Sequence, residues 1–196
     1  MKVLVACECS GRVRDAFLSK GHDAFSCDIL PDVAGSDRHL QCDVREKLVS
    51  PYVWDLIIAH PPCTALCVTG NRHYGGSTER EEAIKFFRLF LETPCQKVCV
   101  ENPVGVISSA IRKPDQYIQP YQFGHPVTKK TGLWLKGLPL LQPTCMVQPQ
   151  ESVVFSSGKK MSQWFYDTSC LPQSERASAR SVTFQGIANA MAEQWG

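Results

Sequence analysis

Residues 54–64 read WDLIIAHPPCT. The apolar run at positions 56–59 is typical of a short strand that is buried on both faces of a parallel sheet. Two prolines end this run, because proline has no N–H to donate to a neighbouring strand. Cys63 is therefore predicted just beyond the carboxyl end of a strand, where ligands bind in open α/β sheets. A purely structural role is the alternative, because unpaired cysteine usually behaves as a small buried hydrophobe.

A second apolar run, residues 96–100, leads to Glu101 in the same manner, and Asn102 and Pro103 follow it. The carboxyl ends of parallel strands meet at one edge of a sheet. We therefore expect Cys63 and Glu101 to face each other across one pocket.

The chain begins with another strand-like run, residues 2–7, and the turn 8–11 follows it. Ser10 is expected to cap the next helix, and Gly21 is expected to end that helix. The apolar stripe of the helix consists of Val13, Ala16 and Phe17.

Two acidic residues follow further predicted strands. Asp28 ends the strand-like run 24–27, and Asp43 follows the run 39–42. A strand, a helix and a second strand that ends in an acid form the unit by which nucleotide-binding sheets hold a ribose. The pattern predicts a Rossmann-like α/β sheet with helices on both faces.

The rest of the chain gives three further expectations. Residues 64–78 are polar and rich in glycine, as a mobile active-site loop would be, and Thr78 is expected to cap a helix with core phenylalanines. Residues 139–182 contain scattered prolines and are expected to form an irregular insert. Thr183 is expected to cap a closing helix, whose core stripe is Ile187, Met191 and Trp195.

The insert also mixes cations with aromatic side chains, as surfaces that bind nucleic-acid strands do. A solvated loop anchored by a few aromatic residues would look the same. The residues concerned are Lys159, Lys160, Trp164, Phe165, Tyr166, Arg176 and Arg180.

Composition sets limits on the class of protein. A chain of 196 residues with 43% hydrophobic and 20% charged residues is expected to form one globular domain, residues 1–196. The net charge of +2 gives no strong indication of a nucleic-acid or membrane partner. The start of the chain does not resemble a signal peptide and no apolar run could cross a bilayer. We therefore expect a cytoplasmic protein, in the host cytoplasm if the source is viral, with its ten cysteines reduced.

A zinc site is the alternative use of the cysteines, because His60, Cys63, Cys67 and His73 lie close together in sequence. The chain contains no Cys-x-x-Cys and no His-x-Glu motif, so it lacks the usual spacing of zinc ligands and the signature of zinc deaminases. No metal site is expected.

Four segments, taken together and in order, resemble the DNA (cytosine-5) methyltransferases, as a small, divergent or phage-like member would. Pro61-Pro62-Cys63 resembles the catalytic Pro-Pro-Cys of that family, and Glu101-Asn102-Pro103 resembles its Glu-Asn-Val. The segment 123–129 is similar to the Phe-Gly-x-Pro motif with its downstream cation, and the segment 187–190 is similar to the closing Gly-Asn-Ala-Val. Motifs of this length are individually weak, and their order over most of the chain makes them more specific.

The resemblance implies transfer of a methyl group from S-adenosylmethionine to C5 of cytosine, in DNA or in a smaller cytosine-containing nucleotide. Cys63 would add to C6, which requires a lowered thiol pKa. Glu101 would act as a general acid at N3, which requires a raised carboxyl pKa, and Lys129 is the candidate cation near the base. The implied cofactor-binding residues are Glu8, Ser10, Gly11, Asp28, Asp43, Pro61 and Asn189.

The chain also departs from the family pattern. Its first turn reads ACECSG with a single glycine, where Glu8 could bind an amino group of the cofactor or crowd it out. The arginines after the Phe-Gly-x-Pro motif are missing, and the insert 139–182 is too short for a full target-recognition domain. Two alternatives therefore stay open: a nucleotide-binding protein without catalysis, and a cytosine-modifying enzyme that uses a different donor.

Overall fold

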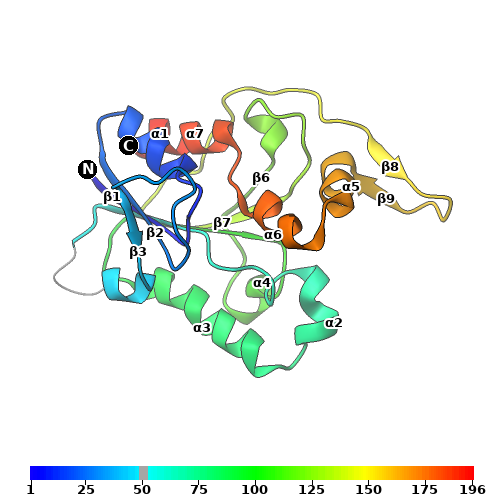
Figure 1. The fold of residues 1–196 in the computed structure, drawn as a ribbon, viewed down its shortest axis with the longest axis horizontal. Coiled ribbons are helices and arrows are strands. Elements are labelled where there is room, and N and C mark those ends of the chain that lie inside the picture. The colour runs from blue at the N-terminus through cyan, green and yellow to red at the C-terminus, as the bar shows by residue number, and fades with distance from the viewer. Residues whose placement is uncertain (49–52) are drawn as a thin grey trace.

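The computed structural model describes residues 1–48 and 53–196, and its centre is a seven-stranded sheet (Figure 1). The strand order is β3-β2-β1-β4-β5-β7-β6. The strands are β1 (Lys2–Ala6), β2 (Asp23–Asp28), β3 (His39–Gln41), β4 (Leu56–Ala59), β5 (Val98–Pro103), β6 (Gln116–Ile118) and β7 (Thr131–Lys136). The helices are α1 (Arg12–Ser19), α2 (Asn71–Tyr74), α3 (Thr78–Glu92), α4 (Ile107–Ala110), α5 (Gln163–Cys170), α6 (Gln173–Ser181) and α7 (Gln185–Trp195).

Strands β1 to β5 pair in parallel, whereas β7 runs antiparallel between β5 and β6. The strand order reverses between β1 and β4: β2 and β3 lie on one side of β1, and β4 and the later strands lie on the other. Such a switch point is where ligands bind in open α/β sheets. The predicted strand ends after residues 59 and 100 therefore lie side by side at this point, because β4 pairs with β5.

Helices cover both faces of the sheet, so the predicted Rossmann-like α/β fold class is confirmed. Figure 1 shows α1 and α7 together on one face and α3 on the other. Alternate residues of a strand point to opposite faces. Leu56 and Ile58 accordingly pack under α1 and α7, whereas Ile57 packs toward α3.

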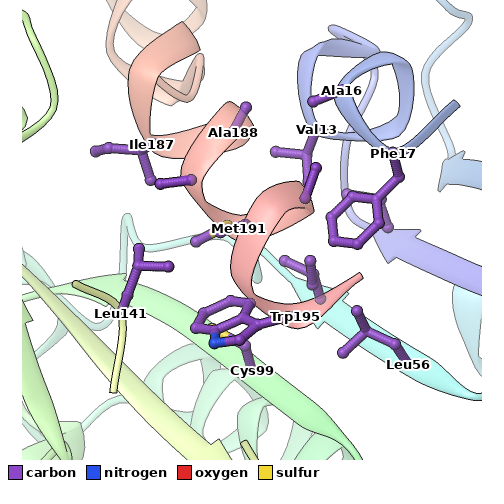
Figure 2. Packing of buried hydrophobic residues seen from close by; sticks show 14 of the residues in the cluster. Val13, Ala16, Phe17, Leu56, Cys99, Leu141, Ile187, Ala188, Met191 and Trp195 are labelled. Carbon is purple, nitrogen blue, oxygen red and sulfur yellow. The ribbon is translucent and has the colours of Figure 1, made fainter. Parts of the chain in front are cut away.

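The two predicted apolar stripes form the core between α1, α7 and the sheet (Figure 2). Phe17 of α1 and Trp195 of α7 are both buried and lie over Leu56 of β4. The other members of the stripes are Val13, Ala16, Ile187 and Met191, and all of them are buried. Residues 17 and 195 thus close the same core from opposite ends of the described chain.

The predicted N-caps were each wrong by one residue, whereas Gly21 ends α1 as predicted, with φ of 82°. The N-cap of α3 is Ser77, whose Oγ accepts a hydrogen bond from the backbone N–H of Arg80, and Thr78 is the first helical residue. Helix α7 has Phe184 at its N-cap and no side-chain cap, so Thr183 does not fill this role. Neighbouring hydroxyl residues such as 77 and 78 are equivalent in sequence, and the approach of the chain to the helix decides between them.

The segment expected to be a mobile loop, residues 64–78, contains the 3-10 turn Val68–Gly70 and the helix α2. Backbone contacts tie its first part to the exit of β5, because Val106 N–H donates to the carbonyl of Leu66 over 2.8 Å. A Cβ at Gly105 would lie 2.0 Å from the same carbonyl oxygen, so only glycine permits this approach.

Residues 139–182 are not irregular throughout, which corrects the expectation. They contain the hairpin β8 (Ser152–Val154) and β9 (Lys160–Ser162), followed by α5 and α6. These elements are short and mostly exposed, so they carry almost none of the apolar periodicity from which elements are predicted. We call residues 151–181 the appended unit, because its hairpin and helices lie beside the sheet (Figure 1).

Both ends of the appended unit are anchored on one short segment. Gln150 N–H donates to the carbonyl of Pro126 over 2.9 Å, and Lys129 Nζ donates to the carbonyl of Arg180 over 2.8 Å. None of the helices in the described part of the chain is both long and apolar enough to cross a membrane.

Candidate active site

Three neighbouring strands bring charged residues to the carboxyl edge of the sheet. Glu8 follows β1, His60 follows β4 and Glu101 lies near the end of β5. The registers Ala6 with Ala59 and Ala59 with Val100 hold these strand ends level. This edge contains the residues expected to be catalytic.

The position of Cys63 is set by the Pro-Pro turn and by Asn102. The buried Asn102 side chain donates from Nδ2 to the carbonyl of Pro61 over 2.8 Å. The carbonyl of Pro61 is therefore bonded within the protein, and this bond helps to fix the turn that leads to Cys63. Cys67 N–H then donates to the carbonyl of Cys63 over 2.8 Å, so the two cysteines are one helical turn apart.

The thiols of Cys63 and Cys67 interact, and this interaction reverses the expected pKa pattern. The interaction with Cys67, together with burial and the nearby charge of Glu101, raises the pKa of Cys63 above its ordinary value. The same interaction lowers the pKa of Cys67 to about 5, and the hydroxyl of Thr69 and backbone N–H groups add to the effect. The Cys67 sulfur lies 3.0 Å from Thr69 Oγ1. The resting thiolate of the pair is therefore Cys67.

Glu101 forms an ion pair with His60. Nδ1 of His60 lies 2.8 Å from Glu101 Oε2, and the two side chains are only 9% and 16% exposed. Burial would raise the pKa of Glu101, but the hydrogen bond and charge of His60 lower it on balance, with help from Lys129. The sequence led us to expect a raised pKa for Glu101, as a general acid requires. This prediction is wrong, because the pairing with His60 lowers the pKa of Glu101.

Lys129 lies between Glu101 and the appended unit. Its ammonium group is 5.4 Å from the centre of the Trp164 ring and 5.9 Å from that of Phe184. Its charge is close enough to lower the pKa of both Glu101 and Cys63. A small pocket here is lined by Glu101, Lys129, Thr131, Thr183 and Phe184 among others. Cys63 is not among the residues that line this pocket, so the pocket brings together Glu101 and Lys129, and Cys63 acts on them electrostatically from outside it.

Glu8 caps helix α1 instead of pointing into open solvent. Its buried carboxylate accepts from the backbone N–H groups of Val13, over 2.8 Å, and Arg14, over 3.3 Å. Ser10, the predicted cap, donates from Oγ to Glu8 Oε1 over 3.3 Å, and Gly11 occupies the N-cap position with φ of 72°. A carboxylate stabilises this helix end because it satisfies free N–H groups and opposes the positive end of the helix dipole.

A buried ion pair that sequence reasoning missed lies beneath this turn. Arg14 Nη1 donates to Asp32 Oδ1 over 2.6 Å and to Ser26 Oγ over 2.8 Å. The Arg14 and Asp32 side chains are 1% and 3% exposed. A Cβ at Gly11 would lie 2.2 Å from the Arg14 guanidinium, so the single glycine of the turn makes room for this arginine. No sequence signal marks Arg14, because it is adjacent to an apolar stripe.

The remaining predicted cofactor residues differ in their surroundings. Asp28 Oδ1 accepts from the N–H of Leu30 over 2.9 Å. Asp43 caps a 3-10 turn and pairs with Arg45, which lowers the pKa of Asp43 through the side-chain and backbone hydrogen bonds. Asn189 lies on the exposed side of α7, where its Oδ1 accepts from Gln185 Nε2 over 2.9 Å. The structure places Asp28, but not Asn189, at the carboxyl edge of the sheet.

The strand end at Asp28 fits a nucleoside-bearing cofactor. Only one oxygen of this carboxylate is bonded within the described residues, which leaves the other for a ribose hydroxyl. Ile29 and Leu30 next to it are 71% and 56% exposed and offer an apolar surface to a flat base. The first turn fits less well, because the amide groups that would receive a carboxylate are already bonded to Glu8.

Two further residues of the site, His60 and Cys67, were considered in the sequence only as possible zinc ligands. His60 directly follows a strand, so the rule that placed Cys63 and Glu101 also applies to it. Within the described residues, no group of three or more His, Cys, Asp or Glu side chains is arranged to hold a metal ion.

The sequence matches neither a protein-family model nor a curated protein. The fold, however, is similar to solved structures of methyltransferases. One is described as a DNA modification methyltransferase encoded within a prophage (E. coli), with 19% identity, a TM-score of 0.52 and coverage of 76% of this chain and 52% of that chain. Another is a mutant of Spodoptera frugiperda DNMT2, with 14% identity, a TM-score of 0.50 and coverage of 76% and 57%. This likeness confirms a methyltransferase-type sheet at the level of the fold. The chain spans little more than half the length of either protein.

Proposed function

We propose that this protein transfers a methyl group from S-adenosylmethionine to C5 of cytosine in DNA, through a covalent adduct with Cys63. The observation that carries the proposal is the position of Cys63, Glu101 and Lys129 at the carboxyl edge of one sheet, within electrostatic reach of one another. One solved structure with this fold is described as a DNA modification methyltransferase, and another is described as DNMT2.

The chemistry begins with the thiol pair. The Cys63 proton passes to the Cys67 sulfur, and the Cys63 thiolate adds to C6 of the cytosine ring. This addition leaves an electron pair in the ring, which Glu101 stabilises by assisting protonation at N3. After methyl transfer, the C5 proton is lost to solvent, and the C6–S bond breaks with its electrons returning to sulfur. A cytosine within a duplex must be flipped out of the stack to reach Cys63.

S-adenosylmethionine supplies the methyl group when it is bound. Asp28 would hold its ribose, and Ile29 and Leu30 would contact its adenine. Gly11 and Ser10 form the first turn beside it, and Asp43 stands at the end of the next strand. Glu8 would act indirectly, by fixing the end of helix α1.

One observation favours a second candidate, a nucleotide-binding protein or an enzyme that uses a different donor. The amides at the start of α1 are bonded to Glu8 and are not free for the carboxylate of the methionine moiety. A ligand without that carboxylate would bind beside Asp28 equally well.

Calorimetric titration with S-adenosylmethionine and its demethylated product tests the cofactor. We expect both to bind to the wild-type protein and Asp28→Ala to abolish the binding. If neither binds and nucleotides without the methionine moiety do, the second candidate replaces the first.

Trapping on an oligonucleotide that contains 5-fluorocytosine tests the chemistry. We expect a covalent adduct with the wild-type protein and with the control Cys170→Ser, whose thiol is exposed on the appended unit. Cys63→Ser should give no adduct. Full methyl transfer by Cys63→Ser would exclude the proposed mechanism.

A further inference from the structure

His60 is the residue at the carboxyl edge for which the mechanism above has no use. Its ring is 9% exposed and its Nδ1 lies 2.8 Å from Glu101 Oε2. The other ring nitrogen, Nε2, is buried and makes no hydrogen bond within the described residues. A histidine that served only to fill space would not require a carboxylate partner, and a buried unpartnered nitrogen is costly.

The charges around His60 determine its protonation. Glu101 of β5 and Glu8 of the first turn are the acidic groups that act on it, and Lys129 is the cation. Burial alone would lower the pKa of His60, but the hydrogen bond and charge of Glu101, with the charge of Glu8, raise it above the ordinary value. The pairing therefore favours the imidazolium form of His60 and the ionised form of Glu101.

We propose that His60 is a positioning residue that supplies, through Glu101, the proton required at N3 of cytosine. The inference rests on the proposed function and adds to it the origin of that proton. An ionised Glu101 has no proton of its own to give, whereas its partner His60 holds one on Nδ1, directly on the carboxylate.

The proton balance is complete within the pair. When the Cys63 sulfur adds to C6, the Nδ1 proton moves to Glu101 and Glu101 delivers a proton to N3, so the ring charge is neutralised. The pair passes from imidazolium and carboxylate to neutral imidazole and carboxylate. When the C6–S bond breaks, N3 returns its proton to Glu101 and His60 recovers it.

This assignment predicts the pH dependence of adduct formation. The pKa of His60 is raised, so its proton is present at low pH and is lost as the pH rises through that pKa. In wild-type protein the rate of trapping on 5-fluorocytosine should fall with that alkaline titration. In His60→Asn the amide still donates to Glu101 but cannot supply a proton. We expect its rate at pH 8 to fall at least tenfold and the alkaline limb to move to lower pH.

His22→Asn is the matched control. His22 lies just before β2, at the opposite edge of the sheet, where it contacts the N-terminal amine. Its profile should equal that of the wild-type protein. Equal thermal melting of the two variants would show that loss of fold does not explain the difference. A profile for His60→Asn identical to the wild-type profile would overturn the inference.

Nitrogen NMR of histidine-labelled protein tests the pair without any reaction. We expect the pKa of His60 to lie above the ordinary histidine value, and Glu101→Gln to lower it, because burial is then opposed only by the charge of Glu8. Failure of Glu101→Gln to lower the His60 pKa would overturn the inference. If the NMR result holds while wild-type protein forms no adduct on any cytosine oligonucleotide, the proposed function fails and this proton role fails with it. A wild-type adduct with an unchanged His60→Asn profile refutes the proton role alone.

Discussion

At the scale of single residues, the site depends on which sulfur of the thiol pair carries the negative charge. The pKa of Cys67 is lowered by the interaction with the Cys63 thiol, by the Thr69 hydroxyl 3.0 Å away and by backbone N–H groups at the start of a 3-10 turn. Cys63 has no such set of donors, and its surroundings contain the negative charge of Glu101. In the proposed reaction Cys63 would therefore be stored as a thiol and activated by transfer of its proton to Cys67, rather than held as a permanently reactive thiolate.

This difference predicts the pattern of thiol labelling. At pH 6.5, iodoacetamide should modify Cys67 before Cys63, because the lowered pKa of Cys67, about 5, keeps that sulfur ionised above this value. Thr69→Val removes one donor, so labelling of Cys67 at pH 6.5 should slow severalfold. Mass spectrometry of the labelled peptides measures both rates, and Cys170 serves as the exposed internal reference. Faster labelling of Cys63 than of Cys67 would contradict the assignment.

The buried pair of Arg14 and Asp32 also acts at this scale. Asp32→Ala leaves an uncompensated buried guanidinium and should cost about 3 kcal/mol of unfolding free energy. Asp15→Ala is the matched control, because Asp15 also binds Arg14 but is 56% exposed, and it should cost well under half as much. Urea denaturation of the three proteins at pH 7 provides the comparison.

The pair also has a pH signature. Burial would raise the pKa of Asp32, but backbone hydrogen bonds and Arg14 lower it on balance. The contribution of ionised Asp32 to the stability of the fold is therefore complete above the ordinary carboxyl pKa. It is lost as the pH falls through the lowered pKa of Asp32 in the folded protein. The stability difference between wild-type protein and Asp32→Ala should shrink below pH 4. A constant difference from pH 7 to pH 3 would exclude this role.

At the scale of elements, two adjacent hydroxyl residues at the start of helix α3 have different roles that the sequence does not distinguish. Ser77 is the N-cap and Thr78 is the first helical residue. Ser77→Ala removes the Oγ that accepts from the N–H of Arg80 and should cost about 1 kcal/mol, or a melting temperature lower by roughly 2–4 °C. Thr78→Ala, in the first helical position and exposed, should change stability by only a few tenths of that amount. A larger loss of stability in Thr78→Ala than in Ser77→Ala would show that Thr78 is the cap, as the sequence led us to expect.

Comparison of the expected with the observed helices and strands shows what a sequence pattern can and cannot predict. Core strands and helices such as β4, α1 and α7 bury apolar residues at fixed spacing, and their stripes were predicted correctly. Helix ends depend on single hydrogen bonds, so Ser10, Thr78 and Thr183 were assigned wrongly. The strand-end rule located Cys63 and Glu101. The rule could not give their protonation, which is set by contacts between residues 41 positions apart in the sequence, as in His60 with Glu101.

At the scale of the whole molecule, the appended unit is a separable addition to the sheet. Its two ends are held at Pro126 and Lys129, which are three residues apart. Replacing residues 151–179 with a flexible linker of about six residues, which can span roughly 20 Å, should therefore leave the sheet folded. We expect cooperative unfolding and binding of S-adenosylmethionine to persist, and binding of DNA to be lost.

The controls for this deletion are two point variants on the unit. Trp164→Ala removes the ring beside Lys129, and should weaken DNA binding without changing cofactor binding. Tyr166→Ala changes an exposed ring that contacts Phe155 within the unit, and should have a smaller effect. Gel-shift and calorimetric measurements separate the two ligands. If the deletion variant binds DNA with the affinity of the full chain, the appended unit is not part of the DNA interface.

The joint core of α1 and α7 has a consequence for the order in which the protein matures on the ribosome. Trp195, which closes the same core as Phe17, is translated 178 residues after it. At ordinary rates of translation this interval lasts on the order of 10 to 40 seconds. During that time one face of the nascent sheet stays open, so helix α1 is a natural contact for chaperones until α7 emerges.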